Sequence, residues 1–216
     1  MSSATTTRVR ADWLQASAAL LDHVFLFGLA AAALAGLSTT FTGSAFFVVG
    51  MVGVLAGAAV SYVTGALRWP AASVVVIGLV VFVLLGGPLC LRAEGSSAYL
   101  PGPGTLSTLG DQVVLGWKEL LTTLPPVDGD GPLLVLPWAL GLVTGLLGGL
   151  TSRVGAGPAL LRAALPLLAP ALLLAAVILL GVPRPQSLWL QGAGFAVLAI
   201  GWLVLRAQRA AAPVRG

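Results

Sequence analysis

The segment AASVVVIGLVVFVLLGGPLCL, residues 71–91, decides the fold class of this chain. It continues for 21 residues without a single charged side chain. An α-helix rises about 1.5 Å per residue and the hydrocarbon core of a bilayer is about 30 Å thick, so this segment is long enough to span a membrane. Its apolar residues are continuous and do not alternate with polar ones, which favours a helix over a strand of a membrane β-barrel.

Five further segments have the same character, and the expected spans are residues 13–37, 43–67, 71–91, 132–151, 160–182 and 188–205. The 216-residue chain is 58% apolar and 8% charged, whereas soluble domains are about 45–50% apolar and about 25% charged. So few charges could not cover a soluble fold, and one cysteine excludes a disulfide framework. We therefore expect an all-α, polytopic membrane bundle whose main partner is the lipid bilayer.

The basic residues predict the orientation, because cytoplasmic loops are enriched in Lys and Arg. With the N-terminus inside, eight of the 11 basic residues are cytoplasmic: Arg8, Arg10, Arg68, Arg153, Arg162, Arg206, Arg209 and Arg215. We expect residues 1–12 and 206–216 to be cytoplasmic tails of a plasma-membrane domain, 13–205. The basic 206–216 segment reads as a linker or as a natural C-terminus. Charges scattered at span ends do not indicate nucleic-acid binding.

The loop at residues 92–131 is the one long segment between spans, and it is expected to lie outside. Its apolar residues recur at spacings of three and four, which predicts an amphipathic helix at about 105–124; they are Leu106, Leu109, Val113, Trp117, Leu120 and Leu124. We expect this helix to lie in the outer interface, with Trp117 and Leu120 in contact with the membrane. A lid over the bundle or a docking face for another domain are the alternatives.

Small residues repeat every four positions in two spans, which predicts close helix packing in lipid. The second span has Gly53, Gly57, Ser61 and Gly65, and the fourth has Gly141, Gly145 and Gly149. A shorter stripe in the first span consists of Gly28, Ala32 and Gly36. We expect contact between the first, second and fourth spans inside one bundle, although contact between protomers is an alternative and the oligomeric state is not predicted.

Asp22 and His23 are the acid and the imidazole within a span, and ionisable groups at that depth are candidates for function. Adjacent helical residues point about 100° apart, so the two do not form a pair. A structural polar contact, for example with Arg162, is one interpretation, and proton or ion handling is the other. Cys90 has no histidine nearby in the sequence to activate it. We identify no catalytic residue, metal ligand or cofactor site.

Two stretches carry a resemblance to a known family. The first is GWKELLTTLPPV at 116–127, followed by the leucine-rich span from Pro132; the second is GPAL at 157–160 with ALPLLAP at 164–170. They resemble the N-terminal membrane region of actinobacterial transglutaminase-like membrane proteins of the TgpA type. This resemblance implies an extracytoplasmic transglutaminase-like domain of the cell envelope, with a cysteine, histidine and aspartate site, located downstream. No catalytic residue of that domain corresponds to a residue of this chain.

Two functional hypotheses follow. The first is a non-catalytic membrane anchor or scaffold for such an envelope domain, positioned by the helix at 105–124. The second is a small transporter, channel or accessory subunit that uses Asp22 and His23. A membrane-embedded enzyme is the least favoured class because the chain has one histidine and no motif for a metal or nucleotide.

Overall fold

The computed structural model describes residues 20–91, 102–153, 158–181 and 185–211. Within these ranges the chain is helical and forms no strand. Six helices are long and apolar enough to span a membrane, which confirms the predicted fold class; they are Leu20–Thr39, Ala45–Ala66, Ala71–Cys90, Pro132–Thr151, Leu161–Leu180 and Trp189–Arg209.

The elements follow one another with short connections. The first span ends in the 3-10 helix η1 (Ala35–Thr39), and α2 (Ala45–Ala66), α3 (Ala71–Cys90) and α4 (Pro103–Thr122) come next. The 3-10 helix η4 (Pro132–Leu134) leads into α5 (Val135–Thr151), and α6 (Ala159–Ala164) is joined by η5 (Leu165–Leu167) to α7 (Leu168–Leu180). The last helix is α8 (Pro185–Ala211).

Two helix boundaries differ from the prediction. The predicted span at 160–182 is interrupted by η5, because Pro166 has no N–H for the helical ladder and its ring disfavours a regular turn before it. The helix predicted at 188–205 continues to Ala211, so Arg206 and Arg209 belong to α8 and not to a tail. The predicted start of the first span at residue 13 lies outside the described residues.

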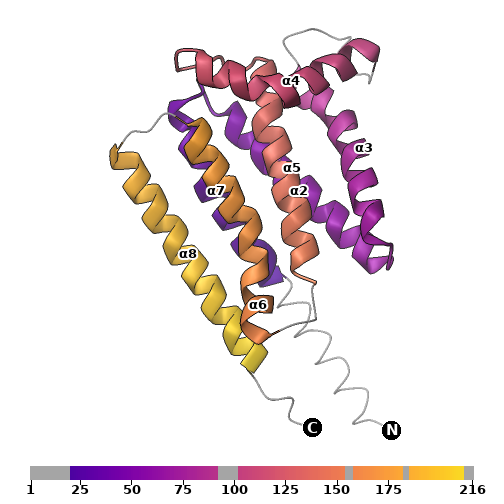
Figure 1. The fold of residues 1–216 in the computed structure, drawn as a ribbon, viewed down its shortest axis with the longest axis vertical. Helices are drawn as coiled ribbons and strands as arrows, with labels where there is room; N and C mark the ends of the chain where they lie inside the picture. Colours follow the sequence, from indigo (N-terminus) through magenta and orange to yellow (C-terminus); the bar gives the residue numbers. More distant parts are fainter. Residues whose placement is uncertain (1–19, 92–101, 154–157, 182–184, 212–216) are drawn as a thin grey trace.

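The bundle is built around α2 and α5 (Figure 1). α3 packs on one side of this pair, and α7 and the first span pack on the other side, with α8 outermost (Figure 1). α4 lies across one end of the bundle (Figure 1). The first span begins, and α8 ends, at the opposite end, where Asp22 and Arg206 form an ion pair.

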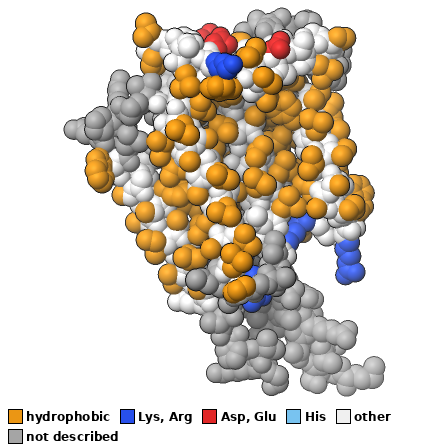
Figure 2. Space-filling view, in the orientation of Figure 1, with side chains coloured by type: hydrophobic (Ala, Val, Ile, Leu, Met, Phe, Trp, Pro, Cys, Tyr) orange, Lys and Arg blue, Asp and Glu red, His pale blue; other side chains and the backbone are white. Residues whose placement is uncertain are grey.

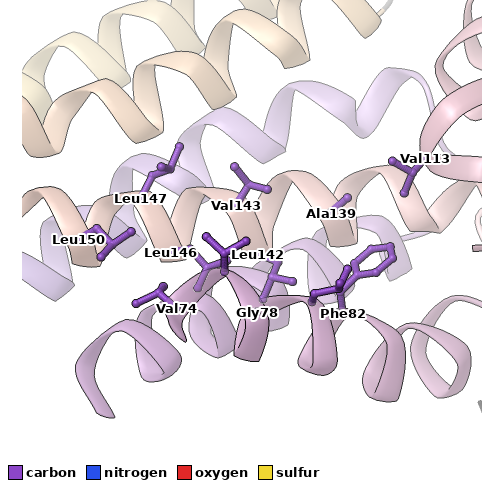
Figure 3. Close-up of a pocket in the computed structure, with 12 residues that line it drawn as sticks. Val74, Gly78, Phe82, Val113, Ala139, Leu142, Val143, Leu146, Leu147 and Leu150 are labelled. Carbon is purple, nitrogen blue, oxygen red and sulfur yellow. The ribbon is translucent and has the colours of Figure 1, made fainter. Parts of the chain in front are cut away.

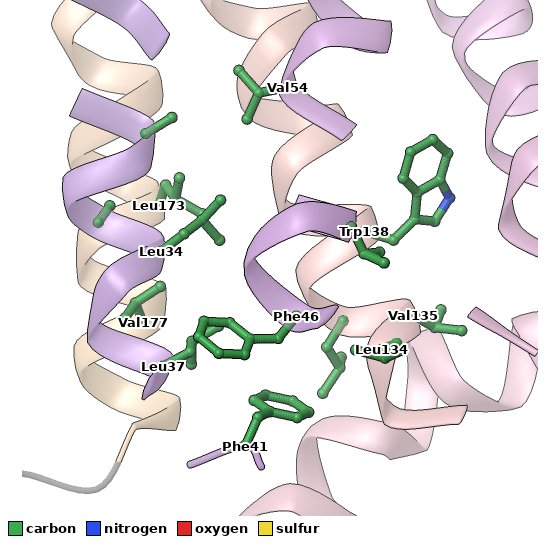
Figure 4. Close-up of a cluster of buried hydrophobic side chains, with 14 of the residues drawn as sticks. Leu34, Leu37, Phe41, Phe46, Val54, Leu134, Val135, Trp138, Leu173 and Val177 are labelled. Carbon is green, nitrogen blue, oxygen red and sulfur yellow. The ribbon is translucent and has the colours of Figure 1, made fainter. Parts of the chain in front are cut away.

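The core joins these layers through large side chains (Figure 4). Leu34 of the first span, Val135 and Trp138 of α5 are each fully buried. Phe41 stacks on Phe46 with ring centroids 5.6 Å apart. In lipid such packing stabilises the bundle by dispersion, since lipid tails are as apolar as the side chains that they would contact.

α4 uses two different apolar faces. Leu109 and Leu120 are buried in the core of the bundle. Leu106, Val113 and Trp117 of the same predicted stripe remain exposed. Leu120 is therefore a core residue and not an interfacial one, because the bundle covers that side of α4. The position of α4 at the membrane surface stays a prediction.

The outer surface of the spans is apolar (Figure 2). Leu79 of α3, Leu179 of α7 and Val197 of α8 are all more than 60% exposed. Charged side chains gather at the two ends of the visible face (Figure 2). Such a surface belongs in a bilayer, so this multi-pass membrane protein contacts lipid along its sides.

Candidate functional site

The predicted glycine stripes of the second and fourth spans lie against each other, where α2 crosses α5. A Cβ atom added to Gly53 would lie 2.7 Å from the carbonyl oxygen of Trp138, which no real Cβ tolerates. Gly57 and Gly145 also face backbone atoms of the opposite helix at distances that exclude any side chain. We call this contact, formed by Gly53, Gly57, Gly141 and Gly145, the glycine seam. It allows two backbones to approach as closely as helices can.

One end of the seam is polar. The Ser61 hydroxyl of α2 donates a hydrogen bond of 2.9 Å to the carbonyl oxygen of Leu146 in α5, and Gly149 leaves room for the Ser61 side chain. Arg153, just beyond α5, returns a bond from its guanidinium to the carbonyl oxygen of Ser61. A Cβ at Gly65 would overlap the Arg153 guanidinium, so a larger residue there would require the Arg153 side chain to move away from this bond.

The stripe of the first span faces elsewhere. A Cβ added to Gly28 would lie 3.8 Å from Leu198 of α8. A Cβ on Gly36 would overlap Gln191 of α8 and Val177 of α7. The closest backbone contact is therefore between the second and fourth spans. The first span meets both of them through larger side chains, Leu34 at Gly50 and Leu26 at Gly148, while its Gly36 faces α7 and α8.

Asp22 is the centre of a polar cluster between the first span and α8. Its carboxylate lies 2.5 Å from Arg206 and 3.3 Å from Arg209, and the indole N–H of Trp202 donates to it at 2.9 Å. The Trp202 ring stacks on Phe25, with centroids 6.2 Å apart. The Arg206 guanidinium also lies over the Trp202 ring, 5.9 Å from its centroid. We call Asp22, Trp202, Arg206 and Arg209 the Asp22 cluster.

Arg162, considered above as a partner of Asp22, takes part in another way. Its carbonyl oxygen accepts a hydrogen bond of 3.3 Å from Arg206. The true partners, Trp202, Arg206 and Arg209, are spaced by four and three residues on one face of α8. The same spacing is present in the sequence, but it indicates a shared helix face only if Arg206 and Arg209 are helical, and they were assigned to a tail.

A second polar contact holds the other end of α8. The Gln191 side-chain amide donates to the carbonyl oxygens of Ala33 at 2.9 Å and Ala32 at 3.1 Å. These two acceptors lie directly before the first span changes from α to 3-10 geometry at Ala35. Sequence analysis missed Gln191, although it is a polar side chain in an apolar span, which is the signal that drew attention to Asp22.

His23 lies near Asp22 but lines a different surface. It borders an apolar groove between the first span and α2, together with Phe27 and Tyr62 among others. It also borders a polar pocket of about 370 Å³ at the end of the bundle, where Asp22, Tyr62 and Arg153 contribute. Asp22 bonds to α8 and His23 also borders the groove beside α2, and the two side chains share the lining of this pocket.

Burial lowers the pKa of the Arg153 guanidinium, since desolvation disfavours its charged form. Among the described residues the ion pairs involve Asp22 and not Arg153. Within the described residues Arg153 therefore forms no ion pair, while Asp22 in the same pocket is paired with Arg206 and Arg209. An anion bound beside Arg153 would stabilise its charged form.

A further apolar groove, of about 410 Å³, lies between α3 and α5 (Figure 3). Phe82 and Val113 close it toward α4, and Gly78 widens it in the middle of α3 (Figure 3). Its walls are almost entirely hydrocarbon, so this groove offers contact with apolar groups and no chemistry.

The described residues contain no recognisable catalytic arrangement of side chains. No group of three histidine, cysteine, aspartate or glutamate side chains gathers there to hold a metal. Cys90 is 1% exposed within the core. A buried thiol of this kind is inaccessible to a substrate from either side of the membrane.

Comparison with protein-family models, curated proteins and solved structures gave no match to this chain. The resemblance to transglutaminase-like membrane proteins therefore stays a prediction from the sequence.

Proposed function

We propose that this protein is a non-catalytic membrane scaffold. The observation that carries the proposal is the engagement of Asp22, the acid placed within a span, by Trp202, Arg206 and Arg209. Polar side chains deeper in the described spans also bond to nearby carbonyls, as Ser61 and Thr144 do. The Asp22 and Ser61 contacts join different helices and stabilise the bundle, and Thr144 is satisfied within its own helix, as expected of a module that holds a fixed shape in the membrane.

The test is Asp22→Asn in liposomes and in a thermal-unfolding assay. A scaffold loses thermal stability and shows no change in ion or proton flux. A flux that depends on Asp22, in protein that remains folded, would overturn the scaffold proposal. The charge swap Asp22→Arg with Arg206→Asp further distinguishes a scaffold from an ion or proton pathway, because it should restore stability in a scaffold.

We further propose that the scaffold supports an extracytoplasmic transglutaminase-like domain or another envelope protein at the α4 end. The sequence resemblance supports this, together with the exposed face of α4 formed by Leu106, Val113 and Trp117. The intact mass of the native gene product tests the attached-domain form. Photo-crosslinking from Leu115, which is 50% exposed on α4, tests a separate partner, with Val197 on α8 as the control position.

The orientation with both termini in the cytoplasm is part of the same proposal. Arg68, Arg153 and Arg206 all lie at the end of the bundle opposite α4, which agrees with the positive-inside rule. Cysteines introduced at Arg68 and at Ser107 provide the test, since Cys90 is buried. An impermeant maleimide should label position 107 in intact cells and position 68 only after lysis.

A transporter or accessory subunit is the second candidate, and the pocket of about 370 Å³ beside Asp22 and His23 favours it. In that case His23→Gln would alter flux or ligand-induced stabilisation. Identical behaviour of the variant and the parent protein across a ligand panel would remove this candidate.

A further inference from the structure

Two hollows at the end of the bundle opposite α4 share a border. The apolar groove of about 400 Å³ lies between the first span and α2 and is lined by Leu20, Phe27 and Leu55, among others. The polar pocket of about 370 Å³ lies at the ends of α2 and α5 and includes Ser152 and Arg153. His23 and Tyr62 line both hollows, so an apolar groove along the spans adjoins a pocket whose lining includes Asp22, Ser152 and Arg153.

Small residues of α2 create this space. Ala58 and Ala59 border the apolar groove, and Gly65 and Ala66 border the polar pocket. Larger side chains at these positions would fill the hollow, as Leu55 and Tyr62 do one turn away. The groove is open on its membrane side, where Leu20, Leu55 and Tyr62 are each more than half exposed.

The polar end favours an anion. The Arg153 guanidinium borders it, is partly desolvated, and donates a hydrogen bond to a neutral carbonyl, that of Ser61. The carboxylate at this end, Asp22, is already neutralised by Arg206 and Arg209. A guanidinium presents a planar fork of N–H donors that matches phosphate oxygens, and Tyr62 adds a hydroxyl group. The Ser152 hydroxyl is already used, since it donates to the carbonyl oxygen of Gly148 at 2.7 Å.

We propose that this composite groove binds one glycerophospholipid, with its phosphate against Arg153 and an acyl chain between the first span and α2. This goes beyond the scaffold proposal and does not depend on it. The argument is one of complementarity: a ligand must be apolar for the length of several helical turns and anionic at the leaflet surface. A free phosphate ion would leave the apolar part empty, and a free hydrocarbon would leave Arg153 without its anion.

The experiment uses the full chain, purified in mild detergent, stripped of lipid and titrated with phosphatidylglycerol in native mass spectrometry. We expect retention of one lipid per chain. Diacylglycerol, which lacks the phosphate, should bind about tenfold more weakly or worse, and millimolar inorganic phosphate should not displace the lipid.

Two variants test the two halves of the groove. Arg153→Gln should weaken phosphatidylglycerol binding about tenfold or more, and Arg153→Lys should recover only part of it because an ammonium lacks the fork. Ala59→Phe should fill the apolar groove from its exposed side and reduce binding by a similar factor. The matched controls are Arg68→Gln at the same end and Val48→Phe on an exposed position of α2, and both should bind like the parent.

Ala59 is exposed and takes no part in the Arg153 bond, so Ala59→Phe keeps the proposal testable if Arg153→Gln unfolds the bundle. Equal binding by Ala59→Phe and Val48→Phe would overturn the proposal. Equal binding of diacylglycerol and phosphatidylglycerol would also overturn it, because binding would then depend on the apolar groove and not on Arg153. Displacement by inorganic phosphate would overturn it in favour of an ion site.

Discussion

α5 and α8 are both spans of this bundle, but they are attached to it in opposite ways. Two thirds of the α5 span (67%) is buried, against 11% of the α8 span. α5 meets α2 along the glycine seam, through backbone contacts over several turns. α8 is held by polar side chains at its two ends, Gln191 at one and the Asp22 cluster at the other. A span can therefore be secured by continuous close packing or by a few strong polar contacts.

The largest effect should come from the seam, with Gly57→Leu. The added side chain would overlap the backbone of α5 at Leu142 and Leu146, and two helices cannot both shift without losing their other contacts. We expect a loss of more than about 3 kcal/mol and little folded protein in size-exclusion chromatography. Gly194→Leu on α8, where a Cβ would meet nothing within 4 Å, is the control. Normal yields of the Gly57 variant would show that the seam is not essential.

Among the polar contacts, the Asp22 cluster should give the largest effect. Asp22→Asn leaves Arg206 and Arg209 facing each other without their anion, at side-chain exposures of 13% and 32%. Because both guanidinium groups retain some solvent, we expect a loss of about 2 kcal/mol, measured as a lower melting temperature. Asp111→Asn, on the exposed side of α4, should leave the melting temperature unchanged. If the two variants behave alike, the cluster does not hold α8.

Gln191→Leu should have a smaller effect, because hydrogen bonds between membrane helices contribute about 1 kcal/mol each. The expected change is local: faster amide hydrogen exchange at the start of α8, with the Asp22 end unaffected. Uniformly faster exchange along α8 would mean that the two attachments are not independent. The double variant with Asp22→Asn should destabilise α8 by the sum of the two effects.

Trp117→Ala on α4 should have the smallest effect on stability, within about 0.5 kcal/mol, since the side chain is 43% exposed. Leu120→Ala, three residues along the same helix, should cost about 2–3 kcal/mol because it opens a cavity in the core. Protease protection of α4 in membranes tests the proposed interfacial role, which predicts a loss of protection for Trp117→Ala. A larger melting-temperature change for Trp117→Ala than for Leu120→Ala would contradict these burial assignments.

Much of the fold was predictable because its signals are local in sequence. The length and apolar character of a segment decide whether it can span a bilayer, and all six spans were identified on this basis. The four-residue spacing of Gly53, Gly57, Gly141 and Gly145 likewise showed which faces could approach closely, since spacing on a helix converts directly into direction. Neither inference requires knowledge of which helices are neighbours.

Only the tertiary structure decided how the polar residues are used. The partners of Asp22 lie 180 residues or more away along the chain, and no sequence pattern links such distant positions. The tertiary structure also decided which apolar residues of α4 are buried and which are exposed, because burial depends on where the bundle lies relative to the helix. Sequence alone determined that the chain forms membrane helices; packing determined whether Asp22 acts as a structural charge and whether Leu120 meets the core or the membrane.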